Sequence, residues 1–135
     1  MTVKRCHPDS MRLSNYYSIG IPSIRHLDGN QTVKCATCRC PLTLIQNIRS
    51  GKFTGQTGSA YLVDGVINVI KGIRCHRRMM SGPHIVCDIF CHICRQRLGW
   101  YYEFAENPEQ QYKEGKYVLE KSLIRFDTLE IGNFI

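Results

Sequence analysis

The sequence predicts a mostly β fold, built from short antiparallel strands with at most one short helix. Runs of β-branched and aromatic residues recur along the chain, and turn residues such as Asp64-Gly65 and Ser81-Gly82-Pro83 separate them. The composition, 43% hydrophobic and 21% charged, is that of a globular chain rather than a disordered one. At 135 residues the chain has room for a single core, which is marginal for short strands without an additional cross-link.

The predicted elements follow from these runs in order. Asp64-Gly65 is the strongest hairpin signal, because a two-residue type I′ turn needs positive φ at both positions. One short helix is expected from Asn107 as the cap, with Pro108 first, Gln110 placed for a capping box and Gly115 at its end. The predicted strands are 23–27, 32–35, 41–45, 60–63, 66–70, 85–90, 97–104 and 116–124.

Three regions are expected along the chain. Residues 1–22 lack a clear period and are interpreted as an N-terminal extension of doubtful order. Residues 23–125 form the predicted domain, and 126–135 form a C-terminal tail.

The expected compartment is intracellular. No apolar run approaches the roughly 18 to 20 residues that span a bilayer, and the first residues lack the apolar core of a signal peptide. We therefore expect the nucleus and cytoplasm, with no membrane association. The net charge of +7 favours acidic partners without specifying one.

Two Cys-x-x-Cys pairs, Cys35/Cys38 and Cys91/Cys94, predict a metal site. Each pair follows a predicted strand, with 52 residues (39–90) between the pairs. Reducing compartments keep thiols free, so such pairs are more often metal ligands than disulfides. Four thiolates complete the tetrahedral shell of one structural Zn²⁺, and closing so long a loop would turn metal affinity into folding free energy. Because catalytic zinc keeps an open position, we expect no enzyme activity and name no catalytic residue.

The other cysteines leave alternatives open. Cys40 could compete as a ligand, although we favour a spare thiol, and Cys6 and Cys75 are interpreted in the same way. Cys87 alternates with Ile85 and Ile89 and is expected to pack as a small apolar residue, although a redox role for Cys40 or Cys87 stays open. His92 lies inside the second pair but is not needed as a ligand.

A basic segment at 71–78 suggests a second function. Its cations, Lys71, Arg74, Arg77 and Arg78, could form a surface that binds nucleic acid. Without interleaved aromatic residues a solvated loop is the preferred interpretation, so nucleic acid is not the expected partner.

Several motifs together resemble the Yippee-like family. They are the two cysteine pairs, Phe53-Thr-Gly-Gln-Thr-Gly-Ser-Ala-Tyr61, Asn68, Leu98-Gly99-Trp100 and Gln111-Tyr-Lys-Glu-Gly-Lys-Tyr-Val-Leu-Glu120. The resemblance covers roughly residues 23–124. It implies a β-tent of two antiparallel sheets pinned by the four-cysteine zinc site, related to the ligand-binding domain of cereblon. The extension, Cys40, Asp64-Gly65 and Pro83 depart from the family pattern.

The resemblance also implies a function and a pocket. It is closest to the branch found with the GID/CTLH ubiquitin ligase, so we expect a protein-interaction module that serves as an accessory or adaptor subunit of such a ligase. In the related cereblon domain a matching Gly-Trp segment lines an aromatic cavity, which proposes Trp100 and Tyr102 as pocket residues here. The alternative is that Trp100 is plain core. A small-molecule ligand is left open, and a methionine sulfoxide reductase-like enzyme is the least favoured alternative.

Overall fold

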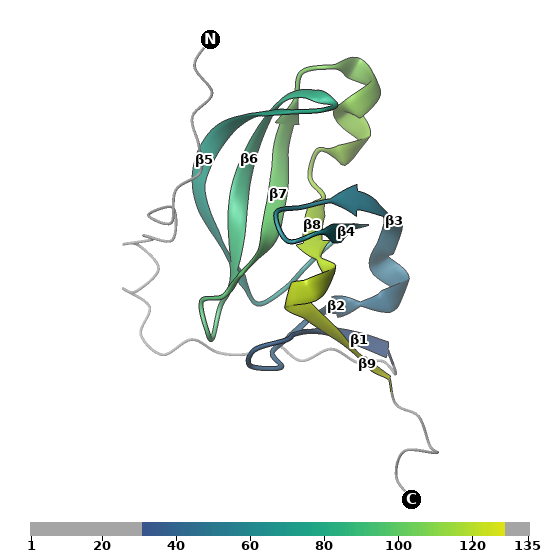
Figure 1. Ribbon diagram of the computed structural model, residues 1–135, viewed down its shortest axis with the longest axis vertical. Coiled ribbons are helices and arrows are strands. Elements are labelled where there is room, and N and C mark those ends of the chain that lie inside the picture. The colour runs from purple at the N-terminus through teal and green to yellow at the C-terminus, as the bar shows by residue number, and fades with distance from the viewer. Residues whose placement is uncertain (1–30, 129–135) are drawn as a thin grey trace, which may run out of the picture.

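The structure is a computed structural model that describes residues 31–128, and it is mostly β as predicted (Figure 1). These residues form a three-stranded sheet and a six-stranded sheet, both antiparallel. Only short 3₁₀ helices connect them. The strands are β1 Gln31–Cys35, β2 Pro41–Leu44, β3 Ile48–Thr54, β4 Ser59–Val63, β5 Val69–Met79, β6 Gly82–Cys91, β7 Arg97–Ala105, β8 Tyr117–Glu120 and β9 Ile124–Thr128. The 3₁₀ helices are η3 Ile45–Asn47, η4 Pro108–Lys113 and η5 Lys121–Leu123.

The small sheet joins distant parts of the chain. Its order is β2-β1-β9, so β1 lies between its sequence neighbour and the last described strand. Cys35 in β1 is paired with Ile124 in β9, and Val33 with Phe126. Figure 1 shows this sheet crossing below the lower end of the large sheet.

The large sheet has the order β3-β4-β8-β7-β6-β5. β5 and β6 form a long hairpin whose turn, Met80-Ser81, is followed by Gly82 at a φ of 112°. β8 is inserted between β4 and β7, which pairs Gly99 with Leu119 and Trp100 with Val118.

Two apolar clusters form the core. The first joins the sheets and includes Val33, Leu42, Ile89, Leu98 and Leu119. The second lies on the large sheet around Trp100, Tyr102 and Val118. Each fully buried leucine or valine removes enough apolar surface from water to contribute about 1.5 to 3 kcal/mol.

The predicted hairpin at Asp64-Gly65 is wrong. β4 and β5 lie far apart in the large sheet, and Gly65 does not have positive φ. Residues 64–68 instead pass over the small sheet, where Gly65 O accepts from Thr43 Oγ1 at 2.7 Å and Ile67 N donates to Leu42 O at 2.7 Å. Pairing of β4 with β3 and β8 outweighs the local turn preference.

Three other local predictions need correction. The segment 116–124 is not one strand, because η5 divides it into β8 and β9. The basic segment is not a loop but the larger part of β5. The predicted helix exists as the 3₁₀ helix η4, but the Asn107 side chain does not cap it and instead donates to Ser81 O at 3.0 Å. The predicted strand 23–27 lies outside the described residues.

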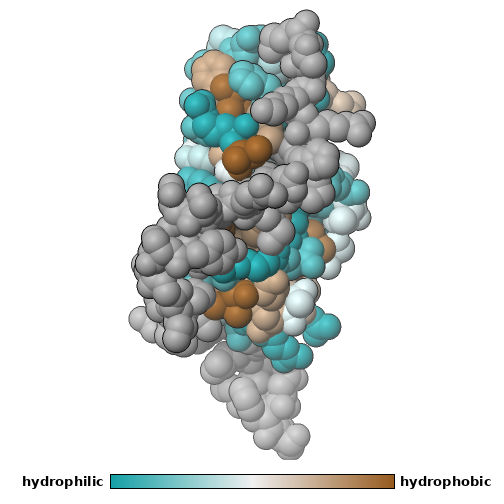
Figure 2. All heavy atoms as spheres, turned by 90° about the vertical axis from the view of Figure 1, so that its left-hand side faces the viewer, coloured by the Kyte–Doolittle hydropathy of each residue, from teal (hydrophilic) through white to brown (hydrophobic). Residues whose placement is uncertain are grey.

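No helix in residues 31–128 is long and apolar enough to cross a membrane. Figure 2 shows the side of the molecule that bears β5, where hydrophilic residues alternate with small apolar areas among the visible described residues.

Candidate metal centre and aromatic pocket

Four cysteines come together where β1 and β6 end. Cys35 and Cys91 are the last residues of those strands, and Cys38 and Cys94 follow three residues later. All four sulfur atoms lie within 4.8 Å of one another. The short separations join the two pairs, at 3.6 Å from Cys35 to Cys94 and 3.4 Å from Cys38 to Cys91. The structure therefore brings together all four cysteines that the sequence predicts as ligands.

The two cysteine turns, or knuckles, have the same backbone geometry. In each, the residue after the second cysteine is an arginine with positive φ, at 66° for Arg39 and 67° for Arg95. This left-handed residue lets the chain reverse directly behind the sulfur atoms. Four backbone bonds fix the two turns: Cys35 N to Cys40 O (2.9 Å), Arg39 N to Cys35 O (2.8 Å), Cys91 N to Gln96 O (2.8 Å) and Arg95 N to Cys91 O (3.0 Å).

Asn68 ties the two knuckles together. Its side-chain amide donates to Pro41 O at 2.7 Å, just beyond the first knuckle. Its backbone carbonyl oxygen accepts from the backbone N–H of His92, inside the second knuckle, at 2.8 Å. Asn68 itself has a φ of 60°, a conformation that asparagine tolerates better than most residues. This geometry gives a physical reason for asparagine at this position of the motif.

The cysteine cluster fits a tetrahedral metal ion. Sulfur atoms held about 2.3 Å from a tetrahedral zinc ion lie roughly 3.8 Å from one another, close to the separations above. They are too far apart for disulfides, whose S–S bond is about 2.05 Å, and all four thiols are free. Burial raises the pKa of the Cys91 thiol, which opposes its ionisation unless a cation lies nearby. Four thiolates would complete the shell of such an ion and leave no open position.

The remaining cysteines lie outside this cluster. Cys40 is buried, with its Sγ 3.8 Å from Pro41 O, and is not among the four grouped sulfurs. Cys87 is buried on β6, where its Sγ donates to Glu103 Oε2 at 3.4 Å; burial and then Glu103 raise its pKa to about 11. The expectation of a free thiol is wrong for Cys75, which is disulfide-bonded. Cys6 lies outside the described residues.

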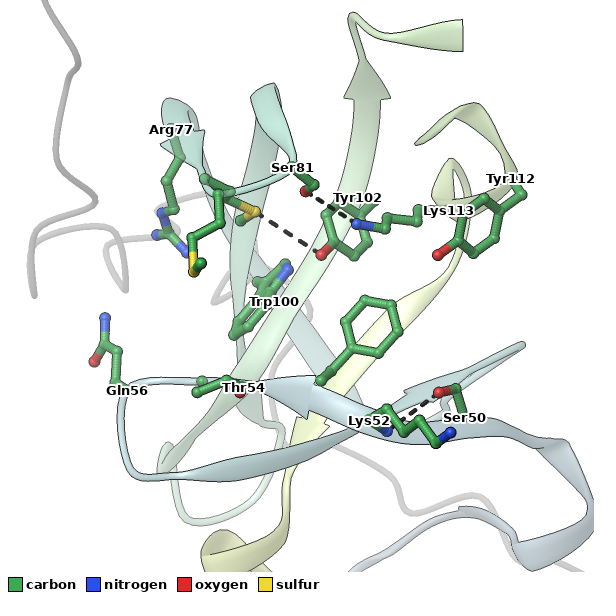
Figure 3. A pocket seen from close by; sticks show the side chains of 14 residues that line it. Ser50, Lys52, Thr54, Gln56, Arg77, Ser81, Trp100, Tyr102, Tyr112 and Lys113 are labelled. Carbon is green, nitrogen blue, oxygen red and sulfur yellow. Dashed lines mark hydrogen bonds between the residues drawn. The ribbon is translucent and has the colours of Figure 1, made fainter. Parts of the chain in front are cut away.

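A second feature is an aromatic pocket of about 590 Å³ on the large sheet (Figure 3). Trp100 and Tyr102 of β7 form its floor. β3 and the turn after it form one side, the β5–β6 hairpin forms another, and η4 closes the third. The other lining residues are Ser50, Lys52, Phe53, Thr54, Gly55, Gln56, Arg77, Met79, Met80, Ser81, Tyr112 and Lys113.

Trp100 and Tyr102 are both core and pocket residues. They are 4% and 1% exposed, and their rings meet edge to face with centroids 6.1 Å apart. The Tyr102 hydroxyl donates to the Met79 sulfur at 3.8 Å, and burial raises its pKa to about 12. The two interpretations of Trp100 are therefore not exclusive, because one ring face belongs to the core cluster while the residue lines the cavity.

Lys113 is a buried cation of this pocket. Its side chain extends from η4 and is only 5% exposed. Its Nζ lies 5.1 Å from the centroid of Phe53, 5.4 Å from Tyr102 and 5.9 Å from Tyr112, within range of cation–π attraction. It donates to Ser81 Oγ at 3.1 Å, and burial lowers its pKa.

A buried carboxylate fixes the β3–β4 turn beside the pocket. Glu120, 0% exposed, accepts from the amide and hydroxyl of Thr57 at 2.7 and 2.6 Å and from Arg97 at 2.8 Å. Burial alone would raise the pKa of Glu120, but these bonds outweigh it and lower the pKa. A Cβ atom at Gly55 would overlap the Glu120 carboxyl group, so glycine is required there.

These sites can be set beside known proteins. Residues 31–133 match the family described as "Yippee zinc-binding/DNA-binding /Mis18, centromere assembly". Protein yippee of Drosophila melanogaster is 43% identical over 101 residues, which is 75% of this chain and 84% of that protein. The chain belongs to the Yippee/Mis18 family. Human protein yippee-like 4 is 43% identical over 93 residues, 69% of this chain and 73% of that protein.

The fold agrees with this membership. The crystal structure of the Mis18 "Yippee-like" domain is similar with a TM-score of 0.59 at 11% identity, over 74% of this chain and 97% of that one. The expected fold, two antiparallel sheets with four clustered cysteines, is confirmed. In this Yippee/Mis18 chain the cysteine knuckles and the Gly-Trp stretch lie in separate sites, the cysteine cluster and the pocket floor.

The four predicted basic residues do not share one surface. Arg77 points into the pocket and contacts the buried Asp88 at 3.1 Å (Figure 3). Arg74 and Arg78 are exposed on the other face of β5, where Arg74 pairs with Glu103 at 2.9 Å. Lys71 lies over the ring of Tyr101, with its Nζ 3.6 Å from the centroid. Arg77 is therefore a pocket residue, whereas Lys71 and Arg74 each contact a residue of β7.

Sequence reasoning missed much of the pocket. Phe53 comes from β3, far from Trp100 along the chain, and Tyr112 and Lys113 come from η4. Phe53 and Lys113 do fall within the motifs that identify the family, but nothing local to either segment shows that they face each other. Long-range pairing of β4 with β8 and β7 with β8 creates this arrangement.

Proposed function

We propose that this chain is a zinc-stabilised protein-interaction module that binds its partner through the aromatic pocket, as an accessory or adaptor subunit of a GID/CTLH-type ubiquitin ligase. The aromatic pocket is the observation that supports binding of a partner. Its volume of about 590 Å³ lies within the roughly 300 to 1,000 Å³ typical of specific ligand sites. Its walls combine four aromatic rings with a few polar groups, the usual composition of such sites.

Zinc is the proposed metal of the cysteine cluster. An all-thiolate tetrahedral site suits Zn²⁺, and the family description includes zinc binding. The knuckles lie at the ends of β1 and β6, which belong to different sheets. In this proposal the ion holds the two sheets together and takes no part in chemistry.

Two features of the thiols support a non-catalytic role. The closed thiolate shell offers no position for a substrate. The redox alternative would need a reactive thiol such as Cys87, but burial raises the pKa of Cys87 to about 11, and the thiolate is the reactive form.

Nucleic-acid binding is the less favoured alternative. The family description names DNA binding, but the basic residues of β5 face opposite sides and three of them have acidic or aromatic partners. If the chain bound phosphates, affinity would fall steeply with salt. A pocket-bound protein partner with apolar contacts would respond much less.

The ligase connection rests on the sequence resemblance and on family membership. The test is to purify the full tagged chain from human cells and identify co-purifying proteins by mass spectrometry. We expect ligase subunits with the wild type, and loss of the pocket-dependent partner with Tyr112→Ala. Tyr112 is 56% exposed, so its removal should leave the fold intact.

Phe104→Ala is the matched control, because Phe104 is 44% exposed and does not line the pocket. It should retain every partner. If no ligase subunits co-purify with the wild-type chain, the adaptor role is refuted. If Tyr112→Ala leaves the set of co-purifying proteins unchanged, the pocket does not bind the partner.

A further inference from the structure

Lys113 is a buried charge that has no counter-ion among residues 31–128. The ion pairs among residues 31–128 join other groups, and no carboxylate of this part of the chain pairs with its Nζ. Its one hydrogen bond in this part of the chain, to Ser81 Oγ, uses one of three donor hydrogens. Buried ammonium groups are normally paired, because removing an isolated charge from water is costly. The aromatic rings offset part of that cost. The ammonium charge of Lys113 still lacks a negative partner in this part of the chain, and two of its donor hydrogens lack an acceptor there.

The rest of the pocket is also short of negative charge. The described residues of its lining include Lys52, Arg77 and Lys113 and no aspartate or glutamate. Arg77 is balanced by Asp88, which is 3% exposed and also contacts Arg97. Among the described lining residues, Lys113 is therefore the buried cation without an acidic partner, whereas Lys52 is exposed to solvent.

This arrangement selects against cationic ligands. Aromatic walls of this kind commonly bind a ligand ammonium group. Here the chain's own ammonium already lies within 6 Å of three ring centroids, and a second cation would be repelled. The complementary ligand is one that brings an anion to Lys113 and apolar surface to the rings.

The rim of the pocket indicates what carries that anion. Met80, at the tip of the β5–β6 hairpin, is fully exposed, and Tyr112 on η4 is 56% exposed. Both line the opening and offer apolar contacts outside the cavity. The cavity accommodates a side chain and its neighbours rather than a folded domain.

We infer that the pocket binds an acidic peptide segment, in which an aspartate or glutamate side chain pairs with Lys113 and flanking apolar residues contact the aromatic walls and rim. This inference rests on the proposed function, since it names the partner chemistry of the same pocket. The charge of Lys113 then serves specificity, because a buried cation left unpaired by a neutral peptide penalises the wrong ligand.

The test uses the full chain and peptides that carry fluorescein on the N-terminal amine and, except where stated, an amide at the C-terminus. One peptide reads Gly-Phe-Glu-Phe-Gly, and a second replaces Glu by Gln at equal size. A third carries Gln with a free C-terminal carboxylate. We expect the Glu peptide to bind at least tenfold more tightly than the Gln peptide by fluorescence anisotropy.

Lys113→Met should abolish this preference. Methionine keeps the length and apolar contacts of the lysine stem, so the variant should keep the wild-type melting temperature within a few degrees. Arg78→Met is the matched control, because Arg78 is exposed on the opposite face of β5, and it should keep the tenfold preference. Should Lys113→Met fail to fold, Tyr112→Ala serves as the second variant and should weaken the Glu peptide at least tenfold.

Three results would overturn the inference. Equal binding of Glu and Gln peptides that still requires Tyr112 would refute the acidic selectivity and leave the proposed function standing. A Lys113→Met variant that is folded and still prefers Glu would remove Lys113 from recognition. Tighter binding of the free C-terminal carboxylate would assign the pocket to chain ends instead. If no peptide depends on Tyr112, the proposed function itself fails.

Discussion

Gly99 lies so close to the backbone of Val118 that a Cβ atom at Gly99 would overlap the Val118 carbonyl oxygen. This contact joins β7 to β8 in the middle of the large sheet. Gly99→Ala must push these strands apart, and we expect a loss of about 3 kcal/mol in unfolding free energy, the upper end of the usual cost of overpacking, by urea denaturation.

Gly65→Ala is the control for Gly99→Ala. A Cβ atom at Gly65 meets nothing within 4 Å, and its φ is not positive. We expect a gain of about 0.4 to 1 kcal/mol, because alanine restricts the unfolded chain. If Gly65→Ala instead destabilises the protein, Gly65 has the positive φ that the predicted Asp64-Gly65 hairpin requires.

Loss of one cysteine ligand should unfold the domain. Cys35→Ser and Cys94→Ser each leave three thiolates, and because metal affinity contributes folding free energy the cooperative thermal transition should disappear. Metal analysis should find one zinc per wild-type chain and almost none in either variant. Cys40→Ser should keep the zinc, since Cys40 lies outside the cluster. Folded wild-type protein without any metal would contradict the zinc assignment.

Glu120 should make stability depend on pH in acid. Its bonds to Thr57 and Arg97 lower its folded pKa below the ordinary value of about 4.3. Its contribution is therefore complete above that ordinary value and is lost as pH falls through the lower folded pKa. Glu120→Gln should cost about 1.5 to 3 kcal/mol at pH 7, and the difference from wild type should narrow below about pH 4.5.

The measurement compares melting curves of wild type and Glu120→Gln from pH 7 to pH 3. Acid loss of metal affects both proteins, so the difference isolates Glu120. A constant difference across this range would show that the Glu120 charge does not stabilise the fold.

Arg77 and Arg78 are neighbours with opposite roles. Arg77 donates to the buried Asp88, so Arg77→Ala should cost about 1.5 to 3 kcal/mol in chemical denaturation. Exposed Arg78→Ala should stay within about 0.5 kcal/mol of wild type. The sequence-based interpretation treats the whole run as solvated and predicts that neither change matters, so equal small effects would favour it over the structure.

Trp100→Ala should behave as a core deletion although Trp100 lines the pocket. At 4% exposure its removal should cost about 3 to 5 kcal/mol in the free energy of unfolding. Tyr112→Ala, on the exposed wall, should cost far less. A stable Trp100→Ala protein would mean that the indole packs only against the cavity.

Local chemistry in the sequence was sufficient to predict the metal cluster and most strands. The cysteine spacing identifies the four clustered residues because the ligand chemistry restricts both residue type and separation. Strands such as 85–90 and 97–104 are rich in β-branched and aromatic residues, and β6 and β7 contain them. The 3₁₀ helix after Asn107 follows from Pro108 and Gly115.

Features that depend on long-range pairing were not predictable in this way. β3 has mixed polarity because it is an edge strand, and β5 appears basic because one face is solvated. The turn preference of Asp64-Gly65 is real but yields to the pairing of β4 with β3 and β8. The pocket depends on side chains from four elements, and Lys113 has no local signature of burial.

The pairing of β1 with β9 has a consequence for biosynthesis. A nascent chain presents Cys35 and Cys38 long before Cys91 and Cys94 are made, and β1 gains its second neighbour only after residue 128 is synthesised. The early product therefore carries a half-formed metal site and an unpaired strand edge. Its free thiols are open to oxidation, and its unpaired edge can aggregate with other chains. Contacts this distant in sequence also slow folding, so the vulnerable interval is extended. Zinc supply and chaperone access during translation should accordingly determine the yield of soluble protein.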